Sequence, residues 1–135
     1  MTIEVTFTVP GDPVPWARAG AKGALRFTPP RQRAFAKGIK ILAKAAMRGR
    51  EPITGPVELS VKAIYQWPQS WSAKKRAEPL ARWKTSRPDE DNLKKIVQDA
   101  LNEIVFVDDA QVCSGHCWKM YGDQAGLLIR VRPLE

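Results

Sequence analysis

Two groups of aspartates stand out in the sequence as side chains that could do chemistry together. Asp89 and Asp91 lie two residues apart, and Asp108 and Asp109 follow the apolar run at 104–107. Seven of the fourteen acidic residues fall between positions 89 and 109, although the chain has a net charge of +8. Crowded carboxylates raise one another's pKa unless protons or cations compensate them. Acid concentrated in this way within a basic chain therefore indicates a local reason, such as a bound cation.

Phosphodiester hydrolysis is the chemistry that such a cluster would perform. Mg²⁺ prefers hard oxygen ligands, is often held by only one or two carboxylates with waters, and leaves positions open for a substrate phosphate. It lowers the pKa of an attacking water and neutralises charge on the phosphoryl oxygens. Lys95 lies four residues after Asp91, so its ammonium is expected to pair with that carboxylate and to reach a scissile phosphate. The structural alternative for Lys95 is a surface ion pair that contributes little to stability.

A helix from about Asp89 to Glu103 is expected to position the first acidic group. Apolar residues at helical spacing predict its buried stripe, which consists of Leu93, Val97, Ala100, Leu101 and Ile104. Its exposed side is predicted to carry Asp91, Lys95, Asp99 and Asn102. The chain after it, at 102–104, lacks the glycine expected at the end of a helix.

The positions of the two acidic groups leave two explanations open. Acids in a first helical turn are favoured by the helix dipole and by free backbone N–H groups, which explains Asp89 and Asp91 without any chemistry. That explanation does not extend well to Asp108 and Asp109. A helix of about fifteen residues spans roughly 22 Å, so a chain that turns back along it could return the second group beside the first. Three or more carboxylates would then gather.

The remaining elements predict a mixed α+β fold. Alternating apolar residues indicate strands at Ile3–Val9 and Val57–Trp67, and periodic ones indicate a helix from Pro30 to about Arg48. The Pro- and Gly-rich segment after the first strand predicts a long loop with a short hairpin around Gly23. The segments 104–109, 111–120 and 125–131 are interpreted as strands ending in a closing hairpin with a turn at 121–124.

Basic side chains gather in the Pro- and Gly-rich loop, in the first predicted helix and in the segment 68–87. This distribution predicts contact with a polyanion such as DNA. The first predicted helix has Phe35, Ile39, Leu42 and Ala46 on one face and cations on the opposite one, namely Arg33, Lys37, Lys40, Lys44 and Arg48. The segment 68–87 interleaves Trp71 and Trp83 with cations, a pattern that suits phosphates and exposed bases. The equally weighted alternative is a solvated flap anchored by its tryptophans. The residues predicted to contact DNA are Arg18, Lys22, Arg26, Arg33, Lys37, Lys40, Lys74, Lys75, Arg76 and Arg87.

Length and composition favour one small domain over residues 1–135, with no apolar run long enough to cross a membrane. The alternating N-terminus does not resemble a secretion signal, and two cysteines without one favour reduced thiols in a cytoplasmic protein. Zinc is the alternative for Cys113, His116 and Cys117. On a regular strand, however, His116 would point to the face opposite both cysteines.

The segment Arg87 to Val112, which reads RPDEDNLKKIVQDALNEIVFVDDAQV, resembles the signature of the RusA Holliday junction resolvase family. In that family an acidic DxDN element opens a helix and a DDxQV element follows it. The N-terminal VPGDPVPWARA and the RFTP at 26–29 are also similar to the family's opening. The resemblance covers most of the chain and keeps the order of the motifs. Glu90 departs from it, because the family often has an apolar residue there.

The resemblance implies a mixed α/β homodimer, bacterial or phage-encoded, that binds four-way DNA junctions in recombination and repair and makes paired symmetric nicks with Mg²⁺ or Mn²⁺. By motif position, Asp89, Asp91 and Asp109 would be the catalytic, metal-binding carboxylates, and Lys95 would assist the transition state. Asp108 and Asn92 would support them. A two-fold dimer suits two equivalent strands. The alternatives are a noncatalytic architectural DNA-binding protein and a related nuclease of flaps or forks.

Overall fold

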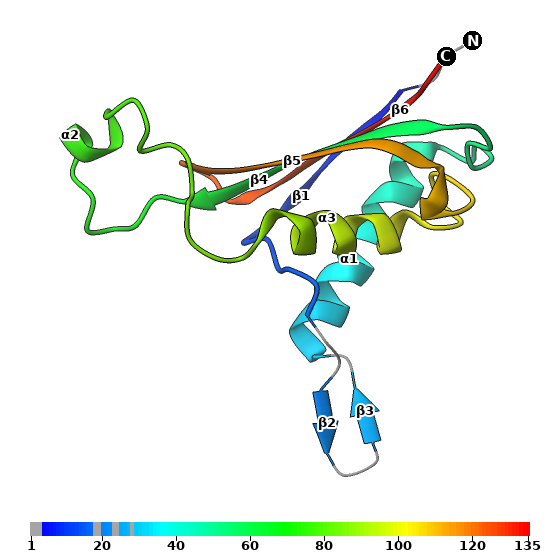
Figure 1. Cartoon of the computed structure of the whole chain (residues 1–135), viewed down its shortest axis with the longest axis horizontal. Coiled ribbons are helices and arrows are strands. Elements are labelled where there is room, and N and C mark those ends of the chain that lie inside the picture. Colours follow the sequence, from blue (N-terminus) through cyan, green and yellow to red (C-terminus); the bar gives the residue numbers. More distant parts are fainter. Residues whose placement is uncertain (1–3, 18–19, 23–24, 28) are drawn as a thin grey trace.

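A four-stranded mixed sheet forms the centre of the computed structural model, which describes residues 4–17, 20–22, 25–27 and 29–135. The strands are β1 (Val5–Pro10), β4 (Val57–Gln66), β5 (Val112–Gly122) and β6 (Gly126–Pro133), in the order β1-β6-β4-β5. The central strand β4 is antiparallel to β6 and parallel to β5, and β6 is antiparallel to β1. Figure 1 shows both main helices on one face of this sheet. The predicted mixed α+β fold with two main helices is confirmed.

The core lies between the sheet and the two helices, α1 (Pro30–Met47) and α3 (Glu90–Leu101). Every second residue of β4, from Val57 to Ala63, is fully buried against them. Because side chains alternate along a strand, the residues between these form a second face of the sheet that carries no helix (Figure 1). In the text below this helix-free side is called the outer face.

Both predicted helices are confirmed, with a shift of the buried stripe on α1. Its most buried residues are Gln32, Ile39, Ala43 and Met47, whereas Phe35, Leu42 and Ala46 are partly buried against the core. All five cations of the predicted basic stripe are exposed. The predicted stripe of α3 is correct at Leu93, Val97, Ala100 and Leu101, with Ile96 added and Ile104 only partly buried.

The closing hairpin predicted for the C-terminal strands is wrong. β5 and β6 are joined by a short turn after Gly122, but β4 lies between them and bonds to both. The turn can pass beyond β4 because that strand already ends at Gln66. Alternation of apolar residues identifies strands, but it does not determine which strands become neighbours.

The apolar run at 104–107 is not a strand either. Val105 and Phe106 are fully buried in a turn, where Phe106 forms an isolated bridge with Ile53. The turn starts at Glu103, which adopts the left-handed conformation with φ of 67°. This is the position at which the sequence lacks the expected glycine.

Two excursions leave the layers of the fold (Figure 1). The predicted N-terminal hairpin is confirmed, with β2 (Gly20–Lys22) antiparallel to β3 (Leu25–Phe27). The segment 67–88, called the flap below, is a loop with one short helix, α2 (Ala73–Arg76). In the part of the chain that is described, no helix is long and apolar enough to cross a membrane.

Candidate active site

The first acidic group lies where α3 begins. Asp89 is the N-cap residue, and Glu90 and Asp91 form the first turn. A capping aspartate normally accepts a hydrogen bond from a first-turn N–H group, but the Asp89 side chain accepts none. Asp89 and Asp91 are both exposed, and neither carboxylate has an ion pair or side-chain hydrogen bond to any described residue. Capping therefore does not account for the carboxylates at this helix end.

The N-terminal loop forms a wall beside this group. The backbone N–H of Trp16 donates to the Asn92 carbonyl at 3.0 Å, and that of Ala17 donates to Gln32 Oε1 at 2.9 Å. These bonds fasten the loop to the starts of α3 and α1. Between the loop and the helix lies an open pocket of about 580 Å³, lined by Pro15, Trp16, Ala17, Arg87, Pro88, Asp89 and Asn92. The predicted site residues Asp89, Asn92 and Arg87 thus meet around one cavity.

The second acidic group divides into one structural carboxylate and one without a partner. Asp108 caps the short helix η1 (Asp109–Gln111), and its carboxylate accepts a hydrogen bond from Ala110 N at 3.0 Å. The Gln111 side chain accepts from Asp108 N at 2.9 Å and donates to the carbonyls of Ile53 and Gly55, both at 2.8 Å. Asp109 is half-buried, and no hydrogen bond or ion pair holds its carboxylate among the described residues.

The predicted return of Asp108 and Asp109 to the start of α3 is wrong within one chain. The twelve residues of α3 span about 18 Å at 1.5 Å per residue. Strand β5 runs back along the helix, since Lys119 Nζ donates to the Pro88 carbonyl at 2.8 Å and a β-carbon on Gly115 would lie 3.3 Å from Lys94 Cδ. Asp109, which precedes β5, is therefore at the far end of α3.

The turn at 102–107 explains this separation, because it buries Val105 and Phe106 at the end of the helix. Only the following strand returns toward Asp89, and its residues from 112 to 119 include no acid. Within the described part of a single chain, no three Asp, Glu, His or Cys side chains are placed to hold one metal ion. One protomer thus presents Asp89 and Asp91 at one end of α3 and Asp109 at the other.

Lys95 does not pair with Asp91 as the sequence analysis expected. Its ammonium lies 3.3 Å from Asp99 Oδ2, one turn further along the helix, and 5.0 Å from the centre of the Trp16 ring. The backbone bond between Trp16 and Asn92 brings this ring over the helix, so the ammonium gains a cation–π contact. Lys95 keeps 45% of its side chain exposed, which limits the strength of the pair with Asp99. Because Lys95 pairs with Asp99, the Asp91 carboxylate has no cation beside it among the described residues.

The basic residues predicted to contact DNA have different surroundings. The stripe on α1 is exposed along its length, and Lys74 and Arg87 are exposed as well. Lys75 pairs with Glu78 at 3.4 Å and lies over the Trp71 ring. Arg76 is half-buried over Trp67. Arg18 and the side chains of Lys22 and Arg26 lie outside the described residues.

The tryptophans of the flap separate into an anchor and an exposed ring. Trp71 packs against Trp67 and Tyr121, with ring centres 5.9 and 5.2 Å apart. It therefore fastens the flap to the sheet, as the alternative interpretation of this segment stated. Trp83 remains 37% exposed on the outer face.

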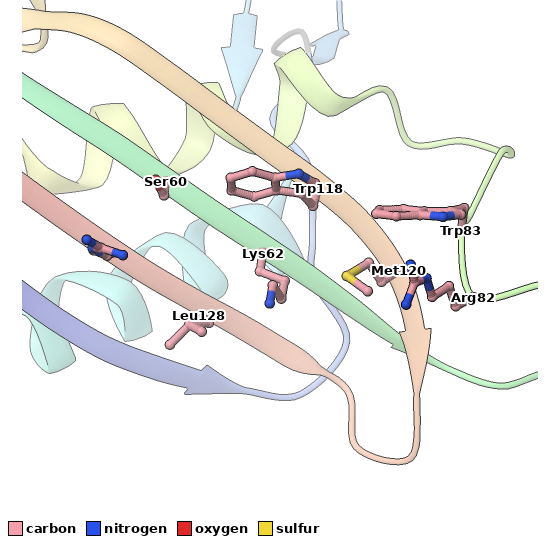
Figure 2. A pocket seen from close by; sticks show the side chains of 8 residues that line it. Ser60, Lys62, Arg82, Trp83, Trp118, Met120 and Leu128 are labelled. Atoms are coloured by element: carbon pink, nitrogen blue, oxygen red, sulfur yellow. The ribbon is translucent and has the colours of Figure 1, made fainter. Parts of the chain in front are cut away.

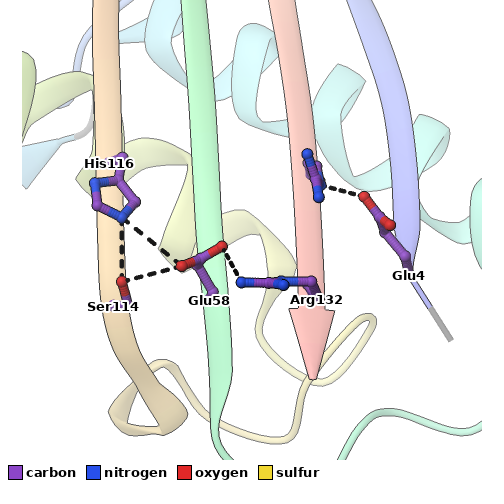
Figure 3. Close-up of polar contacts among 6 residues, drawn as sticks. Glu4, Glu58, Ser114, His116 and Arg132 are labelled. Atoms are coloured by element: carbon purple, nitrogen blue, oxygen red, sulfur yellow. Dashed lines mark hydrogen bonds and ion pairs between the residues drawn. The ribbon is translucent and has the colours of Figure 1, made fainter. Parts of the chain in front are cut away.

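The outer face holds a polar cluster that sequence reasoning missed (Figure 3). Glu58 accepts from Arg132 at 2.9 Å and from the Ser114 hydroxyl at 3.3 Å, and Ser114 Oγ also lies 3.1 Å from His116 Nε2. The same imidazole nitrogen lies 3.9 Å from Glu58. A catalytic relay needs the two ring nitrogens to face different partners. This cluster thus ties three strands together, and cross-strand alternation around β4 was the signal that could have found it.

Among the described residues, Cys113, His116 and Cys117 of strand β5 are not placed to hold one metal ion. Cys117 packs against the core on the side of α3, whereas His116 lies on the outer face. Cys113 is exposed at the irregularity in the pairing of β5 with β4. Burial, with a smaller contribution from Glu90, raises the pKa of the Cys117 thiol to about 11, whereas Lys94 and Lys119 act in the opposite direction. The thiol is therefore protonated at neutral pH, and thiolate is the form that binds metals.

Comparison with known proteins agrees with the motifs around α3. A family model described as endodeoxyribonuclease RusA matches residues 10–132, which extend from the end of β1 into β6 and include both main helices and both acidic groups. A protein of Bacillus subtilis (strain 168), named as uncharacterized protein YqaN, is 32% identical over 138 residues and is covered over 97% of each chain. The chain belongs to the RusA endodeoxyribonuclease family.

Proposed function

We propose that this protein is a divalent-metal-dependent nuclease that resolves four-way DNA junctions by paired, symmetric hydrolysis of phosphodiester bonds. The observation that carries the proposal is the pair Asp89 and Asp91 at the start of α3, whose exposed carboxylates have no partner among the described residues. Asp89 also lines an open pocket. Both aspartates coincide with the DxDN motif of the family to which the chain belongs. Its place would be recombination and repair of bacterial or phage DNA in the cytoplasm.

The carboxylates suit Mg²⁺, with Mn²⁺ as a substitute. Asp89 and Asp91 lie two residues apart at the start of α3, and their carboxylates are hard oxygen donors. In proteins, Mg²⁺ is often held by one or two carboxylates, with waters as the remaining ligands. When bound, the ion would activate a water and stabilise charge on the phosphate. The chain's own contribution is to hold both carboxylates at the start of α3 and to leave a pocket open beside Asp89.

Asp109 can join the same site if a second copy of the chain provides it. A two-fold dimer that places two α3 helices side by side in opposite directions would bring Asp109 of one copy to Asp89 and Asp91 of the other. Such a homodimer would contain two equivalent sites, as two symmetric nicks require. The separation of about 18 Å along α3 supports this arrangement, because three carboxylates of one copy do not converge.

Cations near the pocket would bind the DNA backbone. Arg87 lines the pocket itself, and Lys95 lies one turn beyond it. The five exposed cations of α1 offer a longer track for phosphates, and the excess charge of +8 favours binding of any DNA. Selectivity for branched DNA would come from the spacing of two such surfaces in the dimer.

The test is to incubate the protein with Mg²⁺ and a labelled, immobile four-way junction beside a matched linear duplex. The wild type should give paired nicks in the junction alone. The variant Asp91→Asn should bind the junction with wild-type affinity and give no nicks, because the substitution removes a charged ligand and little volume. Asp123→Asn, at an exposed turn that does not line the pocket, is the matched control and should cut normally.

Each other outcome has a distinct meaning. Cleavage by Asp91→Asn at the wild-type rate would remove Asp91 from the site. Tight, salt-dependent binding of the junction without nicks under Mg²⁺ or Mn²⁺ would favour a noncatalytic architectural protein. Faster cleavage of flaps or forks than of four-way junctions would favour a related nuclease of another branched substrate.

A further inference from the structure

The outer face of the sheet contains a pocket that the proposed active site does not use (Figure 2). It has a volume of about 370 Å³ and opens between the flap and strands β4, β5 and β6. Trp83 and Trp118 form one side of it, with Met120 between them and Leu128 opposite (Figure 2). The exposed fractions of Trp83, Trp118 and Leu128 are 37%, 40% and 36%. Three large apolar side chains thus remain in contact with water around one cavity.

The two indole rings are held in place although they are exposed. Trp83 is fixed by backbone hydrogen bonds on both sides of it, from Lys84 N to the Lys119 carbonyl at 3.1 Å and from Tyr121 N to the Arg82 carbonyl at 2.8 Å. The Trp118 ring stacks on the imidazole of His116, with centres 5.7 Å apart. Aromatic surfaces that are already ordered lose little entropy when a ligand binds.

Positive charge surrounds these rings. The lining includes Lys62, Arg82 and Arg130 but no acidic residue. The Arg82 guanidinium lies 5.1 Å from the centre of the Trp83 ring, and Arg130 is paired with Glu4 at the edge of the sheet. A ligand that complements this lining has flat apolar faces and carries negative charge.

We propose that this pocket binds an unpaired nucleotide of single-stranded DNA. Its base would stack against Trp118 and Trp83, and its phosphates would contact Lys62 and Arg82. Stacking on aromatic rings within a basic groove is the way in which proteins bind single strands without reading their sequence. A second copy of the chain fits less well, because a two-fold interface at this face would bring the cations of both copies together.

The inference rests on the proposed function for its choice of DNA, and the chain connects the two sites. Only five positions separate Lys84 from Asp89. Lys119 fastens the segment between them to β5 by donating to the carbonyls of Ser86 and Pro88 at 2.9 and 2.8 Å. A strand that is unpaired near a branch point could therefore lie on the outer face and continue around the edge of β5 to the start of α3.

The test measures binding of a fluorescently labelled, short oligothymidylate by anisotropy, without divalent metal. Trp118→Ala should weaken binding about ten-fold or more, because one stacked base is worth roughly 1–3 kcal/mol. Trp118→Phe should keep most of the affinity, since it retains an aromatic face. Leu80→Ala is the matched control, because Leu80 is a 79% exposed apolar residue of the flap that does not line the pocket.

Equal affinity of Trp118→Ala and the wild type would overturn the proposal. Sedimentation of the same samples tests the other occupant: if Trp118→Ala turns a dimer into a monomer, the pocket is a contact between copies and the proposal fails. Because Asp91→Asn should bind oligothymidylate normally, loss of junction cleavage leaves this inference intact. Conversely, if the wild type cuts junctions but Trp118→Ala binds oligothymidylate as tightly as the wild type, only the proposal of a nucleotide-binding pocket fails.

Discussion

Aspartates lie at both ends of α3, but the hydrogen bonding of their carboxylates differs between the two ends. At the start of the helix, Asp89 occupies a capping position without using its carboxylate to cap, and Asp91 faces solvent. Beyond the end of the helix, Asp108 caps η1 and is locked by Gln111. The difference shows that the hydrogen-bond partners of an aspartate's oxygens indicate whether it can bind a metal better than its position in a motif does.

Asp109 is the informative exception in this comparison. It belongs to the second group by position, yet its carboxylate has no partner among the described residues, like those of Asp89 and Asp91. The four aspartates therefore divide into three available carboxylates and one structural carboxylate. These three are the ones that we propose as metal ligands.

The largest effect is expected when an available carboxylate is removed. Asp91→Asn and Asp109→Asn should each lower junction cleavage about 100-fold or more, because a metal-bound transition state is stabilised by several kcal/mol. The free energy of unfolding should stay unchanged, since neither carboxylate holds a described residue. Single-turnover cleavage and urea unfolding measure the two quantities.

A mixture of these two inactive variants tests where Asp109 acts. If each site combines Asp89 and Asp91 of one copy with Asp109 of the other, a mixed dimer contains one intact site and regains nicking. If each site lies within one copy, both sites of a mixed dimer remain damaged and no activity returns. The mixture must be unfolded and refolded together so that copies exchange.

The second largest effect concerns the structural side of the comparison. Gln111→Ala removes three hydrogen bonds, of which two join η1 to the segment before β4 and one closes the cap at Asp108. We expect a loss of about 2–4 kcal/mol in the free energy of unfolding, because partly buried carbonyls lose their donors. Urea denaturation measures it, and Gln124→Ala at an exposed turn is the matched control. A loss no greater than that of the control would contradict the structural role of this group.

Much of this fold follows from local patterns in the sequence. The alternation in β4 and the helical spacing in α3 predict both elements because each buries one face against a shared core. The N-terminal hairpin and the irregular flap follow from glycine, proline and polar residues. Prediction failed where distant segments choose partners, as when β4 rather than β6 became the neighbour of β5.

For the candidate site, the sequence predicts which residues to consider but not how they are arranged in space. Similarity to the family motifs predicts Asp89, Asp91 and Asp109 as site residues, and periodicity predicts the first two at a helix start, where the structure has them. Neither signal shows that a buried turn around Phe106 keeps Asp109 at the far end of α3. The contact between Lys95 and Trp16 was equally hidden, because Trp16 comes from a loop almost eighty residues away.

A smaller effect on stability distinguishes whether Asp108 caps η1 or takes part in cleavage. Asp108→Ala should cost about 1 kcal/mol of stability, because it removes the cap from η1, whereas asparagine caps equally well and should cost almost nothing. Cleavage by Asp108→Asn should remain near the wild-type level. A strong cleavage defect in Asp108→Asn at normal stability would instead move Asp108 into the group of available carboxylates.

The smallest effect on stability is expected at Lys95, which lies beside the first group but is bound to Asp99. Because both side chains are nearly half exposed, removing the pair with Lys95→Gln should cost about 0.5 kcal/mol or less. If its ammonium assists the reacting phosphate, cleavage should nevertheless fall at least ten-fold. Asp99→Asn breaks the same ion pair but keeps the ammonium, so it should cut normally. Equal cleavage defects in both variants would mean that the ion pair matters through structure, and Lys95 would then resemble Asp108 more than Asp91.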